Sequence, residues 1–339
     1  MSEPATPSPH SFTPPRLHSA PGSGDGWVED GSGAKFWGRF GAAGLLAYDP
    51  ARGILLQHRA NWSHFGGTWG LPGGARHESE TPVQGAIREA SEEAGVVVEA
   101  LSLTLTSTFD LGFWSYTTVV VDVTSPFEAA ATDAESIEVR WVPVAEVAAL
   151  PLHPGFGASW PTLQAELGRR TVLIVDSANV VGSRPDGWWK DRAAATERLA
   201  ERLARLSSSG FAAAALGIDL PGTHWWPEVR LVVEGAARAA RLPAAAAPPP
   251  AAHAAPASAV PSRTPAPAAA RDAAAPPSLD AGTQPADAHL TGTRAADIAA
   301  RLTLVAAEHD GDQAIVDEVA ALFAAPRPGT PPLPPPTAD

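Results

Sequence analysis

The sequence contains no cysteine, and its 24 basic residues include only two lysines, Lys35 and Lys190. Without cysteine there is no disulfide framework, no zinc or iron–sulfur site with thiolate ligands, and no thiol nucleophile. No stretch approaches the roughly 20 consecutive apolar residues that a membrane-spanning helix needs. Residues 1–12 have neither the basic nor the apolar segment of a secretory signal. These absences predict a cytoplasmic protein that does not interact with membranes.

The balance of charge is acidic, with a formal net charge of −13. Affinity for the nucleic-acid backbone depends on lysine and arginine, so the chain as a whole is expected to bind nucleic acid poorly. The 339 residues allow about two domains. The oligomeric state stays open.

Proline (35 residues) and glycine (30 residues) are abundant, and much of the excess is concentrated in three segments. Dense proline is incompatible with continuous helix or sheet, so these segments are expected to be disordered. The resulting division of the chain is a disordered tail at 1–35, a globular domain at 36–167, an α/β module at 168–242, an Ala/Pro-rich linker at 243–288, a helical remainder of the second module at 289–325, and a disordered tail at 326–339.

Hydrophobic periodicity predicts the secondary structure of the ordered parts. In the first domain, strands are expected at 41–48, 54–58, 101–109, 116–123 and 137–142, and helices at 82–94, 144–150 and 161–167. In the second module, strands are expected at 171–175 and 228–233, and helices at 192–206, 293–307 and 314–323.

The helix at 82–94 carries the most informative motif. Thr81 and Gln84 form a capping-box pattern around Pro82, and Gly95 suits the residue that ends the helix. One face is apolar, whereas Glu89, Glu92 and Glu93 share a patch at i, i+3 and i+4. Like charges at this spacing repel, which is the ordinary situation of a solvated acidic face. A divalent cation such as Mg²⁺, which prefers oxygen ligands, would make the same arrangement favourable.

The complete spacing points to a family. Gly74 is followed after five residues by Glu80, after seven more by Arg88-Glu89, and then by Glu92-Glu93 and Gly95. This pattern, with the preceding loop Trp69–Gly74, resembles the signature of the Nudix hydrolases over about residues 36–167. Position 90 is alanine where the family consensus has any aliphatic residue, which is a mild departure. The resemblance implies an α/β/α sandwich with a mixed sheet.

The resemblance also implies roles for individual residues. Glu89, Glu92, Glu93 and the Gly73 carbonyl would hold Mg²⁺, with Mn²⁺ as the alternative ion. Arg88 would orient the carboxylates, with Glu80 as its partner. A second acidic group usually comes from a loop before a late strand, and Glu135 is chosen there over Asp133 and Glu138; the alternative for Glu135 is an ordinary solvated acid.

The implied reaction is hydrolysis of an acid anhydride, the pyrophosphate bond of a nucleoside di- or triphosphate derivative. Metal ions neutralise the phosphate charge and activate water, and a glutamate takes the proton of that water. Asp110 and Leu111 stand where ADP-ribose enzymes of the family tend to have proline, which argues against that substrate. The short domain resembles the antimutator type of the family, which favours an 8-oxo-dGTP-like nucleotide. Candidate substrate contacts are Arg59, Phe113 and Trp114, although aromatic residues in such a region are more often part of the core.

The second module offers weaker signals. Asp176 and Asn179 follow an apolar strand, in a pattern that resembles the opening of NYN/PIN-like nuclease domains, and Asp310 and Asp312 resemble a later acidic step. The Ala/Pro tract interrupts this pattern, so a structural turn at Asp176 is the preferred interpretation. Two alternatives to a hydrolase therefore remain: a nucleotide-sensing scaffold, or an RNA-processing protein that acts through the second module.

Overall fold

The computed structural model describes residues 22–184, 187–242, 301–308 and 310–324. The expected linker at 243–288 and the C-terminal tail at 326–339 lie outside these residues, as does most of the expected N-terminal tail. None of the helices in the described part of the chain is long and apolar enough to span a membrane.

A mixed sheet forms the centre of the N-terminal module. Its strands follow the order β11-β12-β7-β8-β3-β4-β5, while β6 pairs with β3 and β9 with β4. β3 and β8 run parallel and the other pairs antiparallel. The strands are β3 (Ala42–Asp49), β4 (Gly53–Arg59), β5 (Trp69–Gly70), β6 (Gly73–Ala75), β7 (Leu101–Asp110), β8 (Ser115–Val123), β9 (Ser136–Val142), β11 (Phe211–Ala212) and β12 (His224–Trp225).

Helices cover both faces of this sheet. Alternate residues of β3 point to opposite sides: Leu45 lies in a core with Ala90 of α1 (Pro82–Ala94), whereas Leu46 lies in a second core with Trp160 of α2 (Pro154–Glu166). Period-two alternation in a central strand is what two buried faces require. The α/β/α sandwich with a mixed sheet is therefore confirmed. Short 3₁₀ turns complete the module: η1 (Val98–Ala100) and η2 (Val147–Ala149).

The N-terminal segment differs from expectation. Composition predicts disorder for residues 22–35, yet they include part of a hairpin of β1 (Trp27–Glu29) and β2 (Lys35–Trp37). Its Phe36 ring lies 4.9 Å from Trp114, and the Trp114 indole donates to the Trp37 carbonyl at 3.0 Å. These aromatic contacts join the hairpin to a distant part of the chain, which local composition does not reveal.

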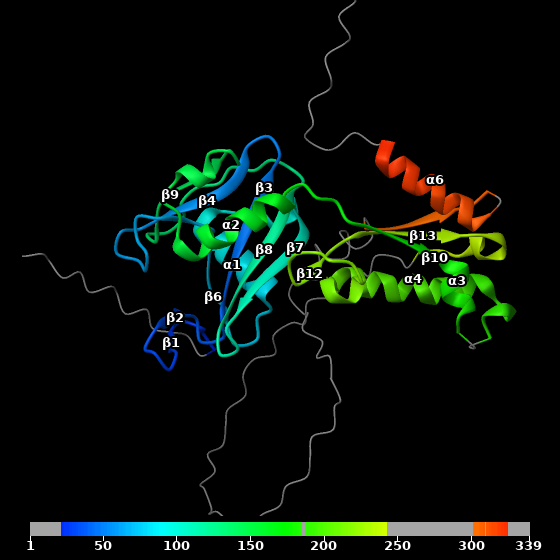
Figure 1. Ribbon diagram of the computed structural model, residues 1–339, viewed down its shortest axis with the longest axis horizontal. Coiled ribbons are helices and arrows are strands. Elements are labelled where there is room, and N and C mark those ends of the chain that lie inside the picture. The colour runs from blue at the N-terminus through cyan, green and yellow to red at the C-terminus, as the bar shows by residue number, and fades with distance from the viewer. Residues whose placement is uncertain (1–21, 185–186, 243–300, 309, 325–339) are drawn as a thin grey trace, which may run out of the picture.

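The second module is a smaller α/β unit with a three-stranded parallel sheet in the order β10-β13-β14. Figure 1 shows α6 on one face of this sheet and α4 with α3 on the other. The elements are β10 (Val172–Asp176), α3 (Ser177–Gly182), η3 (Trp188–Lys190), α4 (Arg192–Ser209), η4 (Ala213–Leu216), β13 (Glu228–Val233), η5 (Gly235–Ala239), β14 (Leu302–Ala306) and α6 (Gly311–Ala324).

The sequence predicts one element of this module wrongly, as a helix where the structure has a strand. The expected helix at 293–307 lies partly outside the described residues, and its described end, Leu302–Ala306, is strand β14. β14 pairs with β13 over five residues, with Leu302 opposite Val229. Pairing with a strand some 70 positions away in the chain overrides the local alanine-rich helical signal.

The boundary placed at 168 is not a clean structural division. β12 extends the sheet of the N-terminal module by pairing with β7, and Trp225 is fully buried in that module's core. Arg301, next to β14, donates to the Leu103 carbonyl and to the Ser102 hydroxyl at 2.7 and 2.6 Å. The two modules are therefore joined by buried contacts.

Candidate functional site

Helix α1 positions the acidic motif, and its ends are fixed by local chemistry. The Thr81 hydroxyl accepts a hydrogen bond from the Gln84 amide, and the Gln84 side chain accepts one from the Thr81 amide. Gly95 ends the helix in a left-handed conformation with a φ of 64°, which glycine adopts without strain. The predicted bounds of this helix are those observed.

Strand β6 lies beside the acidic face of α1. The Gly73 amide donates to Glu93 Oε2 at 2.8 Å, and a Cβ at Gly74 would come within 2.7 Å of the Glu89 carboxylate. A Cβ at Gly73 would overlap the Ala43 carbonyl of β3. Glycine at position 74 therefore lets the Glu89 carboxylate approach β6, and glycine at position 73 lets β6 lie close to β3.

The three motif glutamates lie in different environments. Glu93 is buried, with 4% of its surface exposed. Glu89 is largely covered, whereas Glu92 is exposed. The three carboxylates of the motif therefore range from buried (Glu93) through partly covered (Glu89) to exposed (Glu92).

Arg88 is the cation within this group of acids. It contacts both carboxylate oxygens of Glu80, at 2.6 and 3.0 Å, and its Nη2 donates to the Ala75 carbonyl at 3.0 Å. Its Nη1 donates to Glu89 at 2.9 Å and to Glu92 at 3.2 Å. Burial favours the neutral form of Glu80, but hydrogen bonding to Arg88 and to the His77 amide outweighs burial and lowers the pKa of Glu80.

The two covered carboxylates are short of positive charge. Burial, together with the nearby charges of Glu89, Asp133 and Glu135, raises the pKa of Glu93 to about 8. Burial, with the charges of Glu92 and Asp25, raises the pKa of Glu89 to about 7 even though Arg88 is adjacent. A carboxylate cluster of this kind attracts cations.

Glu135, the candidate second acidic group, belongs to the same electrostatic cluster. Burial and the charges of Asp133 and Asp25 raise the pKa of Glu135, while Arg59 opposes this shift. The loop before β9 is tied to α1, because the Thr132 amide donates to the Glu93 carbonyl at 3.1 Å. Glu138, the other candidate, lies on β9, and its carboxylate is 3.8 Å from Arg140.

The chemistry of these donors fits a hard divalent cation: carboxylate oxygens crowd together with no competing thiol. In the described residues, however, no three acidic or histidine side chains are already arranged around a common ion position. Glu92 is turned toward Arg88. The carboxylates that could hold a cation are therefore present, but Glu92 is held in an ion pair with Arg88.

Arg59 lies among histidines at the edge of this cluster. Its Nε donates to the His64 carbonyl at 3.2 Å. Burial and the charge of Arg59 lower the pKa of His153, to about 4, and that of His64. The Trp27 and His64 rings are 5.0 Å apart, so the N-terminal hairpin reaches this region too. Arg59 is therefore bordered by neutral aromatic rings.

Phe113 and Trp114 lie in and beside the turn between β7 and β8. Phe113 is half exposed, 5.5 Å from the Phe36 ring. Trp114 holds the N-terminal hairpin, as described above. The observed partners of both rings are thus residues of this chain. This observation supports a packing role, and the role in substrate binding stays a prediction.

Asp25, Trp27, His64 and His153 were missed by the sequence analysis. For Trp27 a signal existed: apolar residues at 27–28 and 36–37 flank Asp30-Gly31-Ser32-Gly33, a hairpin pattern. For Asp25 there was none, because an aspartate in a Gly/Ser-rich stretch is typical of a loop. Its place beside Glu89 depends on packing between segments far apart in the chain.

The acidic residues of the second module lie at or beyond the carboxyl ends of its parallel strands. Asp176 accepts from the Asn179 amide at 3.0 Å and from its side chain at 2.7 Å, which caps α3. Asp310 accepts from the Asp312 amide at 2.9 Å, at the start of α6. Glu234, which follows β13 and was not singled out, accepts from the Gly311 amide at 2.9 Å. The nuclease-like role of Asp176, Asn179, Asp310 and Asp312, like the preferred structural interpretation of Asp176, stays a prediction.

Comparison with known proteins supports the resemblance of the N-terminal module to Nudix hydrolases. A NUDIX domain model matches residues 38–163. A protein named putative 8-oxo-dGTP diphosphatase 3, from Mycobacterium tuberculosis strain H37Rv, is 53% identical over 153 residues, which cover 42% of this chain and 70% of that protein. A nucleoside triphosphate pyrophosphatase/Nudix hydrolase fusion protein from Bifidobacterium longum strain NCC 2705 is 39% identical, covering 47% of this chain and 34% of that protein.

A solved structure is similar in sequence as well. The crystal structure of RenU, a Nudix hydrolase from M. smegmatis, is 51% identical, covers 42% of this chain and 94% of that one, and gives a TM-score of 0.39. The glutamate motif of α1, the matching domain model and the 53% identity to the M. tuberculosis protein lead to the same conclusion: the chain belongs to the Nudix hydrolase family.

Proposed function

We propose that the N-terminal module hydrolyses the pyrophosphate bond of a nucleoside di- or triphosphate derivative, with an 8-oxo-dGTP-like nucleotide favoured. The observation that carries this proposal is the acidic face of α1, where Glu89 and Glu93 are packed against the glycines of β6 beside Arg88. The name of the M. tuberculosis relative supports the substrate class.

The proposed cofactor is Mg²⁺, with Mn²⁺ as the alternative, held by Glu89, Glu92, Glu93 and the Gly73 carbonyl. When bound, the ion would neutralise charge on the phosphate oxygens and lower the pKa of a coordinated water molecule. Glu92 would leave its 3.2 Å contact with Arg88 to join the set. That contact is exposed and therefore weak, so the exchange costs little.

Two other residues prepare the site without contacting substrate. Arg88, fixed by Glu80 and by the Ala75 carbonyl, holds Glu89 in place through its Nη1. Because its five N–H donors lie in one plane, Arg88 can bind Glu80 through two contacts and still reach Glu89. We assign Arg88 and Glu80 as positioning residues.

We assign Glu135 as the group that takes the proton of the attacking water. An efficient general base has a pKa near the pH at which the enzyme works. The pKa of the partly buried Glu135 carboxylate is raised, which brings it closer to that pH. Arg59, whose charge acts on Glu135, would bind a phosphate oxygen of the substrate. Phe113 and Trp114 remain candidates for contact with the base.

The test is release of phosphate or pyrophosphate from a panel of nucleotides that includes 8-oxo-dGTP, dGTP and ADP-ribose. Wild type is assayed with Mg²⁺ and with a chelator, beside Glu92→Gln and a control, Glu99→Gln, whose carboxylate lies on η1. We expect Glu92→Gln to lower kcat by about 100-fold or more and the control to retain the wild-type rate.

Two results would overturn the proposal. If wild type turns over no nucleotide but binds one, the nucleotide-sensing scaffold is the better description. If Glu92→Gln retains the full rate, the acidic face of α1 does not carry the reaction.

A further inference from the structure

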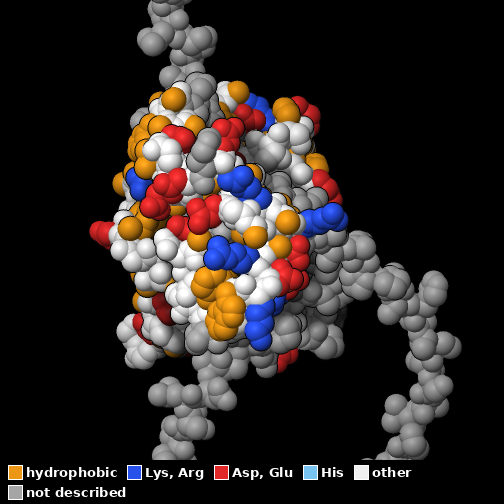
Figure 2. All heavy atoms as spheres, turned by 90° about the vertical axis from the view of Figure 1, so that its right-hand side faces the viewer, with side chains coloured by type: hydrophobic (Ala, Val, Ile, Leu, Met, Phe, Trp, Pro, Cys, Tyr) orange, Lys and Arg blue, Asp and Glu red, His pale blue; other side chains and the backbone are white. Residues whose placement is uncertain are grey.

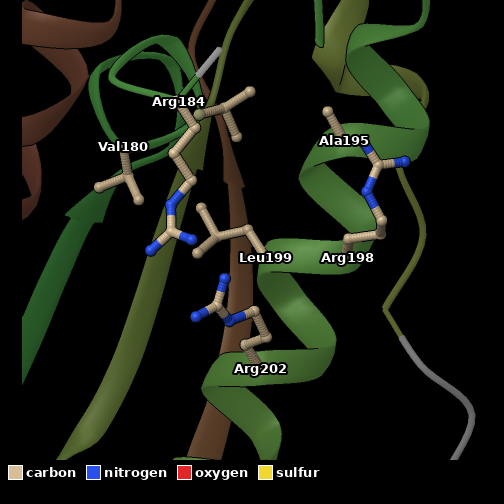
Figure 3. Close-up of a pocket in the computed structure, with 7 residues that line it drawn as sticks. Val180, Arg184, Ala195, Arg198, Leu199 and Arg202 are labelled. Atoms are coloured by element: carbon tan, nitrogen blue, oxygen red, sulfur yellow. The ribbon is translucent and has the colours of Figure 1, made fainter. Parts of the chain in front are cut away.

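The second module contains a cavity that the hydrolase reaction does not use. Helices α3 and α4 pack side by side and line a cavity of about 130 Å³. Val180, Val181, Ala195 and Leu199 supply apolar side chains, and the other lining residues are all arginines: Arg184, Arg198 and Arg202. Figure 3 shows Arg184, which follows α3, and Arg202 of α4 directing their guanidinium groups toward each other beside Leu199.

Some described arginines pair with a carboxylate, whereas the three that line this cavity, like Arg205 on the same helix, form no ion pair with a described residue. Arg52, Arg88, Arg169, Arg170 and Arg230, for example, each form an ion pair with a carboxylate. Arg184, Arg198 and Arg202 form none with any described residue, and no described carboxylate lines the cavity. On the same helix, Glu197 instead accepts from the Arg241 amide at 3.0 Å.

Facing guanidinium groups are unfavourable without an anion between them, since arginine stays charged at any physiological pH. The molecule has a formal net charge of −13, so a local excess of positive charge is the exception on its surface. Figure 2, which views the molecule from the end formed by the second module, shows blue Lys and Arg side chains interspersed with red Asp and Glu and with hydrophobic side chains on this face.

We propose that this cavity binds the phosphate group of a small anion, with Arg184 and Arg202 as the principal contacts and Arg198 at the rim. Guanidinium groups bind phosphate oxygens through paired hydrogen bonds, which lysine cannot reproduce. At about 130 Å³ the cavity has room for one or two phosphate groups but is below the usual size of a pocket that encloses a whole nucleotide. The ligand is therefore inorganic phosphate or pyrophosphate, or the phosphate end of a nucleotide whose remainder stays outside.

This site is independent of the proposed hydrolase activity. Its residues come from α3, α4 and the segment between them, and none belongs to the acidic cluster of α1. Phosphate binding by arginines needs no metal ion. At the hydrolase site, in contrast, the carboxylates repel an anion unless a metal ion lies between them. Binding that is measured in the presence of a chelator and is lost on substitution of Arg184 and Arg202 therefore reports the arginine cavity.

Isothermal titration calorimetry on the full chain, at low salt and with a chelator, tests the proposal. The probes are inorganic pyrophosphate, inorganic phosphate, a nucleoside monophosphate and a short single-stranded oligonucleotide. The variants are Arg184→Gln/Arg202→Gln, the charge-preserving Arg184→Lys/Arg202→Lys, and a control, Arg205→Gln, which removes an exposed arginine of α4 that does not line the cavity.

We expect at least one small phosphate probe to bind wild type, with a Kd that rises about 10-fold or more in the Gln double variant. The Lys double variant should fall between the two, and Arg205→Gln should stay within about twofold of wild type. Tighter binding of pyrophosphate than of the nucleoside monophosphate identifies a free anion as the ligand; the reverse identifies a nucleotide.

Three results would overturn the proposal: no binding of any small phosphate probe, binding of the oligonucleotide alone, or equal affinity in wild type and the Gln double variant. Because the substituted side chains are exposed, the variants are expected to fold, and circular dichroism checks this.

Discussion

The Glu93 carboxylate accepts a hydrogen bond from the Gly73 amide at 2.8 Å, which joins α1 to β6 in the interior of the N-terminal module. A buried carboxylate with a single backbone donor and three acidic neighbours is costly for the fold. The same arrangement is what a divalent cation would stabilise. Stability and activity should therefore respond in opposite directions to the loss of this charge.

The first prediction concerns Glu93→Gln. The side-chain amide oxygen of the substituted residue can still accept from the Gly73 amide, while the cost of burying or protonating the carboxylate is gone. In the absence of metal we expect the free energy of unfolding to rise by about 1–2 kcal/mol, and the metal-dependent rate to fall by about 100-fold or more. Urea denaturation with a chelator and initial rates with Mg²⁺ measure the two effects. A less stable variant with an unchanged rate would contradict both expectations.

The second prediction concerns Asp25, whose charge acts on both Glu89 and Glu135. Asp25→Asn removes one negative charge from the cluster, so cations are attracted less strongly. We expect the Mg²⁺ concentration for half-maximal rate to rise about 3- to 10-fold. The control is Asp30→Asn, a partly exposed aspartate of the neighbouring hairpin that accepts from the Ser32 and Ala34 amides. Equal metal requirements in the two variants would show that Asp25 is not part of the site.

The third prediction tests the connection between the modules. Trp225 is fully buried among Leu105, Val120 and Trp160, and its indole donates to the Pro221 carbonyl at 2.8 Å. Trp225→Ala should lower the free energy of unfolding of the N-terminal module by about 3–5 kcal/mol. Trp189→Ala, at a side chain 60% exposed, should change it by about 0.5 kcal/mol or less. Chemical denaturation followed by circular dichroism distinguishes the two, and similar effects would mean that β12 does not stabilise the sheet.

The fourth prediction is a pH dependence at the turn between β3 and β4. Burial opposes the charge of Asp49, but hydrogen bonds from the Arg52 side chain, at 2.6 Å, and from the Ala51 and Arg52 amides outweigh burial and lower the pKa of Asp49 below 3.8. A carboxyl group with a lowered pKa in the folded state adds stability above its unfolded pKa and loses it as the pH falls through the folded value.

Wild type should therefore exceed Asp49→Asn in free energy of unfolding by a constant amount near neutral pH. The difference should shrink as the pH falls below about 4. Urea denaturation of both proteins across this range measures the difference. A difference that does not vary with pH would assign the effect of the substitution to packing instead of charge.

The parts of the site that sequence predicted are those set by local interactions. The capping box at Thr81, the termination at Gly95 and the acidic face between them depend on residues at most a few positions apart. The same holds for β3 and β4, whose apolar residues are joined by a short turn. Where neighbouring residues supply the interaction, the pattern is present in the sequence itself.

The parts that sequence did not predict depend on distant partners. Residues 22–35 have the composition of a disordered tail. In the structure, however, Phe36 and Trp37 contact Trp114, and the charge of Asp25 acts on Glu89. Leu302–Ala306 forms a strand because β13 offers it an edge to pair with. In both cases an interaction between segments far apart in the chain outweighs the local preference.

The sequence alone determined the family, the helix that carries Glu89, Glu92 and Glu93, and the chemistry those residues can perform, because the motif is contiguous and its spacing places the acids on one face. Only the tertiary structure decided that Glu93 is buried while Glu92 pairs with Arg88, that Asp25 joins the cluster, and that Arg184 and Arg202 face each other across a cavity. Burial and the distances between charges are properties of the packed molecule, and those properties set the pKa values and the unpaired charge from which the functions proposed above follow.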